Sequence, residues 1–282
     1  SEGDNFTGSL LIGHETTGTL SSAQYNTAVG LAALDALTTG DYNTAIGYDA
    51  LTANTTGINN TASGYQALYS NITGDYNTAS GYEALFSNTT GDYNTASGSR
   101  ALKFNTTGDK NTANGSYALY SNTTGINNTA IGDQALYKNS TASYNTAIGS
   151  EALYNNTTGT VNTAIGYQAL DANTTGTVNT AIGSGALTKN TTGNYNMAIG
   201  NYALQHNTTG DKNTAIGHYS DVGTTGDNNV TIGYDADVSS SSASNQIVIG
   251  QGATGQGNNY AVIGNSSITR LYAAQDAGAT LY

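Results

Sequence analysis

Aromatic side chains recur at a fixed interval along this chain and are its first candidates for binding chemistry. They form two sets, each following one 17-residue period, and exposed rings in such rows can stack on sugar rings or apolar surfaces. Alternatively, the rings shield the flank of the fold or fill an interface between chains. The candidate ligand-binding residues are Tyr48, Tyr65 and Tyr82 in one set, and Tyr69, Phe86, Tyr120, Tyr137 and Tyr154 in the other.

Three aspartates follow the same interval and would form an acidic column. Asp75, Asp92 and Asp109 are evenly spaced by one such period. Carboxylates stacked at neighbouring positions repel one another, and a divalent cation bound between them would relieve that repulsion. The simpler interpretation is a solvated turn, so we assign the chain no metal site and no cofactor.

Catalytic groups do not gather into a recognisable motif. The chain has no Cys, and its three histidines, His14, His206 and His218, are scattered. The Ser and Thr residues lie in repeated turns without a neighbouring His, and the pair Gly250 and Gly252 lacks the strand–helix context of a dinucleotide site. An active site would stand out as a non-repeating acidic cluster, and none is evident. We therefore expect no enzymatic activity.

Charge and composition exclude further classes of function. Seven Lys and Arg against 19 Asp and Glu give a net charge of -12, which would repel the phosphates of nucleic acid. No run of about 18 apolar residues occurs, so we expect no membrane insertion by this segment. Leu, Ile, Val and Phe make up only 45 of 282 residues, which would suggest disorder unless the core is built from small residues.

A 17-residue repeat explains this composition. Asn recurs at that interval from Asn26 to Asn213, and Gly follows each of these asparagines at the same offset, as Gly30 follows Asn26. The Gly position extends outward to Gly13 and onward to Gly233, Gly250 and Gly264, which makes sixteen copies. A unit of this length is too short for a strand and a helix with two turns. The repeat therefore predicts an all-β fold, a parallel β-solenoid of about sixteen coils.

One coil is represented by 43–59, and we number its positions 1 to 17 from Asn43. N-T-A-I-G predicts a strand that ends at Gly of position 5. The stretch x-A-L-x-x predicts a second short strand. Thr of position 2 and Ile of position 4 are expected inside with Leu of position 9, and Ala of position 3 on the other face. N-T-T-G is a turn in which we expect Gly of position 15 to adopt a positive φ.

Two structural ladders are expected from identical residues stacked about 4.8 Å apart. Asparagines of position 1 would bond one another along the stack, and leucines of position 9 would form an inner column. N-x-[ST] sequons such as Asn54, Asn88 and Asn105 follow automatically from N-T-T-G and are weak evidence for glycan attachment. Position 4 carries Ser63, Ser80, Ser97 and Asn114 in four successive coils, which predicts a buried polar run. The ladders include Asn43, Asn60, Asn77, Asn94, Leu51, Leu68, Leu85 and Leu102.

The chain divides into four segments. Residues 1–8 are a polar lead-in, and 9–228 form the regular 17-residue-repeat solenoid. Residues 229–267 are degenerate terminal coils that include a Ser-rich loop from Ser239 to Ser244. Residues 268–282 break the pattern and are a cap or the start of a further fibre domain.

Copies such as N-T-A-I-G-Y-Q-A-L at 162–170 and Y-A-V-I-G-N-S-S at 260–267 resemble the head repeat of trimeric autotransporter adhesins. The repeat is also similar to stretches of bacteriophage tail fibres. The resemblance covers roughly 9–267 and implies a left-handed parallel β-roll, three chains side by side and exposure on a surface fibre. The coil of that family is usually shorter, whereas N-T-T-G lengthens the turn here.

The expected function is that of a structural or adhesive module of an extracellular, cell-surface or virion fibre. A strand that is apolar on both faces is usually covered on both, so we expect a homotrimer whose Ala ladders allow close approach. The rod would present or form a surface-recognition site for a glycan or a cell-surface receptor. Two alternatives remain open, a monomeric solenoid whose Thr ladder binds ice and a glycan-cleaving β-solenoid enzyme.

Overall fold

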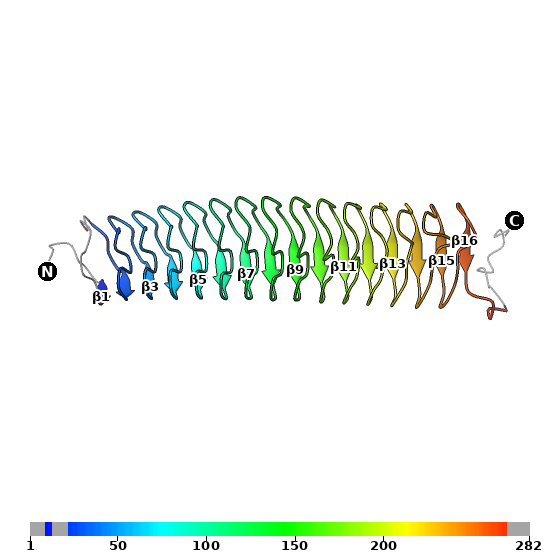
Figure 1. Cartoon of the computed structure of the whole chain (residues 1–282), viewed down its shortest axis with the longest axis horizontal. Coiled ribbons are helices and arrows are strands. Elements are labelled where there is room, and N and C mark those ends of the chain that lie inside the picture. Colours follow the sequence, from blue (N-terminus) through cyan, green and yellow to red (C-terminus); the bar gives the residue numbers. More distant parts are fainter. Residues whose placement is uncertain (1–8, 13–21, 270–282) are drawn as a thin grey trace, which may run out of the picture.

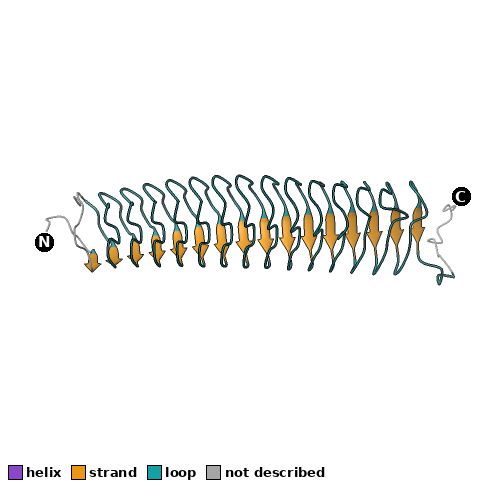
Figure 2. Ribbon diagram, in the orientation of Figure 1, coloured by secondary structure: helices purple, strands orange, loops and turns teal. Residues whose placement is uncertain are grey.

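The chain forms a long rod in which one short strand is added with each coil. The computed structural model describes residues 9–12 and 22–269, so the lead-in, His14 and residues 270–282 lie outside the described part. The strands line one side of the rod, and turns and loops complete each coil (Figures 1 and 2). The strands are β1 Leu10–Ile12, β2 Thr27–Val29, β3 Thr44–Ile46, β4 Thr61–Ser63, β5 Thr78–Ser80, β6 Thr95–Ser97, β7 Thr112–Asn114, β8 Thr129–Ile131, β9 Thr146–Ile148, β10 Thr163–Ile165, β11 Thr180–Ile182, β12 Met197–Ile199, β13 Thr214–Ile216, β14 Val230–Ile232, β15 Ile247–Ile249 and β16 Ala261–Ile263.

All sixteen strands belong to one parallel sheet in sequence order. Neighbouring strands pair one repeat apart, as Ala45 with Ala62 and Ala62 with Ala79. The parallel β-solenoid predicted from the 17-residue repeat is therefore confirmed. In the part of the chain that the structure describes, no helix is long and apolar enough to cross a membrane.

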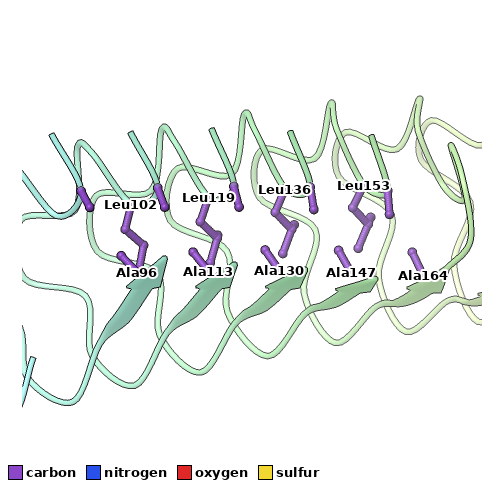
Figure 3. Packing of buried hydrophobic residues seen from close by; sticks show 14 of the residues in the cluster. Ala96, Leu102, Ala113, Leu119, Ala130, Leu136, Ala147, Leu153 and Ala164 are labelled. Carbon is purple, nitrogen blue, oxygen red and sulfur yellow. The ribbon is translucent and has the colours of Figure 1, made fainter. Parts of the chain in front are cut away.

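The apolar half of the interior consists of one Leu column and two Ala columns. Leu side chains from the wall opposite the strands point toward the strand alanines, as Leu119 does toward Ala113 (Figure 3). The predicted Leu column is confirmed from Leu34 to Leu204, and most of its members are fully buried. The Leu column fills the narrow space between the two walls, so only a small residue fits opposite it on the strand.

The predicted orientation of the strand was wrong. Ala45 is 0% exposed, whereas Ile46 is 47% exposed, and the same alternation recurs in the other strands. Position 3 points inward, and positions 2 and 4 point outward. The alanines of positions 3 and 8 therefore line the coil interior and are not available to another chain. Alternation along the strand is strict, so an inward Ala forces Thr and Ile out.

The predicted second strand is instead a tight turn with unusual backbone angles. The segment around positions 6 to 11 contains no strand, and residues of positions 7 and 9 have positive φ, 55° at Tyr117 and 50° at Leu119. Such angles cost non-glycine residues about 1–3 kcal/mol each. The stack holds Leu119 in place, because its N–H donates to the carbonyl of Ala135 in the next coil at 2.9 Å.

The polar half of the interior consists of two Asn ladders, of which the first was predicted. Asn94 donates from its backbone N–H to Asn77 Oδ1 at 2.9 Å and from Nδ2 to the Gly108 carbonyl at 2.8 Å. The second ladder uses position 12, where Asn105 Nδ2 donates to Asn88 Oδ1 at 2.8 Å and to the Gly108 carbonyl at 2.9 Å. These buried amides are thus satisfied by their own coil and by the neighbouring coils, as burial requires.

Glycine recurs at two positions of the coil for different reasons. At position 5 the backbone has φ near 138° in Gly47, and a Cβ there would overlap the carbonyl of Gly64. At position 15 we expected a positive φ, and this was wrong. Gly91 has ordinary angles, but a Cβ on it would lie 2.5 Å from the Gly108 oxygen and 2.6 Å from Asn88 Oδ1. Close approach of the coils, rather than the turn angle, favours glycine there, although Ala142 and Ala243 occupy this position in other coils.

The repeat shortens by one residue after Asn213, and the interior changes there. The Leu column ends at Leu204, and Val222 and Val238 take over the apolar interior. The second Asn ladder ends at Asn207, whose Oδ1 is the buried side-chain atom in the described residues without a hydrogen-bond partner. Strands β14 to β16 still continue the sheet beyond this point.

Shortening one leucine side chain inside the column tests this packing. Leu119→Ala should lower the free energy of unfolding by about 2–5 kcal/mol, because the rigid stack cannot collapse onto the cavity. Thr107→Ala, at an exposed turn position, should stay within about 0.5 kcal/mol of the parent chain. Denaturant unfolding followed by circular dichroism measures both, and equal losses in the two variants would contradict the assigned core.

Candidate functional site

The predicted aromatic residues lie in stacked columns along the rod. At position 6, Tyr65 stacks between Tyr48 and Tyr82, with ring centroids 5.4 and 5.2 Å apart. At position 10, Tyr69 stacks on Phe86 at 5.0 Å. These spacings follow the coil-to-coil distance, so the structure brings equivalent residues of successive coils together.

The longest position-10 stack contains the other three predicted residues. Tyr137 lies between Tyr120 at 5.0 Å and Tyr154 at 5.1 Å, with interplanar angles of 5° and 4°. Burial, followed by the neighbouring tyrosines, raises the pKa of Tyr137 above its usual value. Both faces of this ring are covered by other rings. A ligand can therefore use the edges of the column or the open face at its end, but not the faces inside it.

A charged cluster that the sequence analysis missed joins these columns. Glu83 Oε2 accepts hydrogen bonds from Arg100 Nε at 2.8 Å and from Lys103 Nζ at 2.7 Å. Burial works to raise the pKa of Glu83, but the bonds from Lys103 and Arg100 outweigh it and hold that pKa below its usual value. The signal was present in the sequence, because Glu83 and Arg100 carry opposite charges at the same coil position one repeat apart.

Arg100 also continues the position-6 aromatic column beyond Tyr82, where its stack of rings ends. Its guanidinium carbon lies 5.3 Å from the Tyr82 ring centroid and 5.6 Å from that of Tyr117, and Arg100 Nη1 donates to the Tyr117 hydroxyl at 2.7 Å. Cation–π contacts of this kind are favourable. The flank from Tyr48 to Tyr154 is therefore a fixed surface of rings and paired charges.

The outward face of the sheet is a second regular surface. It consists of a Thr column at position 2 and an Ile column at position 4, and no residue at these positions of β2 to β16 is charged. The run Ser63, Ser80, Ser97 and Asn114 lies on this face and is exposed. The predicted buried polar run was therefore wrong, because position 4 points away from the interior in every coil that carries these residues.

The aspartates of position 16 bind the backbone of the preceding coil. Asp92 Oδ1 accepts the N–H of Asp75 at 2.7 Å, and Asp109 Oδ1 accepts the N–H of Asp92 at 2.8 Å. Each carboxylate thus satisfies a backbone donor, which gives the column a structural role. Within the described residues, no three His, Asp or Glu side chains lie together as metal ligands would.

The N-x-[ST] sequons at position 12 of the coil lie inside the solenoid. Asn54, Asn88 and Asn105 are fully buried, and the Nδ2 atom of Asn88 donates to both Asn71 and Gly91. The nitrogen that would carry a glycan is therefore committed to the ladder in the folded chain. The other sequons of this position are buried in the same way, namely Asn71, Asn122, Asn139, Asn156, Asn173, Asn190 and Asn207.

The structure also brings together an acidic cluster that does not repeat. His206 Nδ1 lies 2.5 Å from Asp221 Oδ2, and Asp221 pairs with Asp237 of the next coil in a parallel bridge. Burial raises the pKa of Asp221 despite the hydrogen bond from His206, and burial and Asp221 raise that of Asp237. No such cluster is evident in the sequence, because the shift in spacing after Asn213 hides which residues share a column.

No hydroxyl nucleophile accompanies this His–Asp pair. Among the hydrogen bonds of the described residues, the His206 ring bonds only Asp221. A catalytic triad needs a nucleophile within hydrogen-bond reach of the imidazole. His206 and Asp221 therefore form a hydrogen-bonded pair at the point where the repeat changes.

The chain matches no protein-family model and no curated protein sequence.

Acid titration tests the buried carboxylate of Asp221. Because the pKa of Asp221 is raised in the folded state, its contribution favours folding below about pH 4 and is lost as the pH rises through the folded value. Asp221→Asn removes this dependence. The unfolding free energy of the variant minus that of the parent should therefore become more positive from acidic to neutral pH, and a difference that stays constant would contradict the assignment.

Proposed function

We propose that this chain is a structural and adhesive module of an extracellular or virion fibre, a rigid rod that assembles as a side-by-side homotrimer and carries a recognition surface. The observation that supports it most is the outward sheet face, which exposes isoleucines on many successive coils. Ile131, Ile165 and Ile182 are 40%, 36% and 37% exposed. Contiguous apolar patches of this length on an exposed surface mark interaction sites.

The composition of the face favours a second copy of the chain as its partner. The chain carries a net charge of -12, yet the outward positions of β2 to β16 are uncharged. A copy of the same chain offers an equally neutral face with the same coil spacing, so its rows of Thr and Ile match along the whole length. A charged partner would lose solvation here without gaining an ion pair.

The dimensions of the face are sufficient for a stable assembly. Sixteen strands spaced about 4.8 Å apart extend roughly 70 Å, and a three-residue strand adds roughly 10 Å of width. This corresponds to roughly 700 Å² per chain, close to the about 800 Å² per partner of a standard interface. In a trimer each chain shares its face with two others, so each pair of chains uses about half of this area and the three contacts together bury roughly 2,100 Å².

The rod itself supports a spacer role. Each coil bonds the next through several backbone hydrogen bonds, and the strand, turn and Asn columns all continue in register. A stack of this kind resists bending and holds its ends apart. In this role the chain performs no catalytic step, and the module lies outside the cell or on a virion.

Light scattering tests the assembly. A native mass near 86 kDa, three times the 28.7 kDa chain, is expected for the parent chain. Ile165→Asp with Ile182→Asp should shift the mass to that of the monomer, because six buried carboxylates would face one another. The control Thr175→Asp, at an exposed turn position, should leave the mass unchanged. A parent mass of one chain would refute the homotrimer.

Ice binding is the second candidate, and one observation favours it. Position 2 was expected to point inward, which counted against a Thr ladder that binds ice. Thr129, Thr146 and Thr163 instead lie in register on the outward face. A monomeric parent chain that also shows thermal hysteresis would support this candidate over the fibre, whereas a trimer would bury the Thr ladder.

A further inference from the structure

The position-10 aromatic stack ends abruptly at Tyr154. Tyr137 has rings on both faces, but the equivalent residue one coil after Tyr154 is Asp171. Tyr154 therefore has a neighbouring ring on one side only. The place where the next ring of the column would stand is open to a ligand.

A hollow of about 210 Å³ lies at this place, and we call it the ladder-end hollow. It is smaller than the about 300–1,000 Å³ of pockets that hold drug-sized molecules, so it suits a single small ring. The residues that line it are Gln134, Glu151, Tyr154, Asn155 and Asp171.

The polar lining of the hollow is rich in acceptors. Glu151 Oε2 accepts from Gln168 at 2.6 Å, and Asp171 Oδ1 lies 3.4 Å from Asn155 Nδ2. Within the described residues no protein donor reaches Glu151 Oε1 or Asp171 Oδ2. Burial and the charge of Glu151 raise the pKa of Asp171. Hydroxyl donors from a ligand would satisfy these free carboxylate oxygens.

The ammonium group of Lys138 lies close to the Tyr154 ring. Lys138 Nζ lies 5.3 Å from the Tyr154 ring centroid and donates to Asn155 Oδ1 at 2.8 Å. A cationic ligand on this ring would meet Lys138, and an anionic one would meet Glu151 and Asp171. A neutral ligand with an apolar face and several hydroxyl groups avoids both.

We propose that the ladder-end hollow binds one pyranose ring of a neutral glycan, stacked on Tyr154 as the next ring of the column, with hydroxyl groups donating to Glu151 and Asp171. The site deepens the recognition role of the proposed function and rests on it. Leu153, which precedes Tyr154, points across the coil toward the strands (Figure 3). The hollow thus lies on the wall opposite the sheet face proposed for assembly, and the two can be tested separately.

The sharpest variant fills the hollow with the missing ring. Asp171→Tyr gives the residue type that position 10 carries in Tyr120, Tyr137 and Tyr154, so the fold should tolerate it and extend the stack. Asp35→Tyr makes the same substitution at the same coil position far from the hollow and is the matched control. Tyr154→Ala removes the stacking face.

Binding is measured on an immobilised panel of neutral-hexose, amino-sugar and uronic-acid oligosaccharides. The parent chain should bind neutral-hexose members, Asp171→Tyr and Tyr154→Ala should bind them roughly tenfold more weakly or worse, and Asp35→Tyr should bind like the parent. Absence of neutral-hexose binding, binding confined to amine- or acid-bearing probes, or parent-like binding by Asp171→Tyr would each overturn the proposal. Light scattering on the same samples reports assembly independently, so a monomer that still binds sugar would refute only the trimer.

Discussion

Hydrogen bonding between equivalent residues of successive coils is the constraint on which this structure depends. Because most backbone N–H groups donate to an adjacent coil, every coil must follow the path of its neighbour closely. Gly91 shows the consequence, since even a methyl group there would meet the next turn. Positions 5 and 15 therefore remain glycine in most coils, and proline, which lacks the N–H donor, is absent from the chain.

The same constraint explains how so few large apolar residues can support a fold. A Leu column and two Ala columns fill one half of the interior, and two ladders of buried Asn fill the other. A buried amide is costly when it lacks partners, but a stacked amide finds its donor and acceptor in the coils on either side. The positive φ of Leu119 persists for the same reason, because the stack determines its position from two directions.

Residues that depart from the repeat are where distinct chemistry arises. Glu83, Arg100 and Lys103 form one charged cluster, His206, Asp221 and Asp237 form another, and Asp171 ends the longest aromatic stack. Inside a uniform column the faces of rings and the polar atoms are used by the neighbouring coils. An interruption leaves such groups without their usual partner and makes them available to a ligand or to one another.

The periodicity by itself determined the length of the coil, the parallel stacking, the Leu column and the Asn ladder of position 1, because residues that recur once in every coil must meet their own copies. It could not determine which face of a three-residue strand is buried. T-A-I alternates whichever way it points, and bulk alone suggested Ile inside. Only the folded coil showed that Leu from the opposite wall already fills the space, so that Ala fits inside and Thr and Ile form the outer face. The His206–Asp221 pair likewise depends on the shortened coil after Asn213, because its contacts follow from the path of the chain rather than from the repeat.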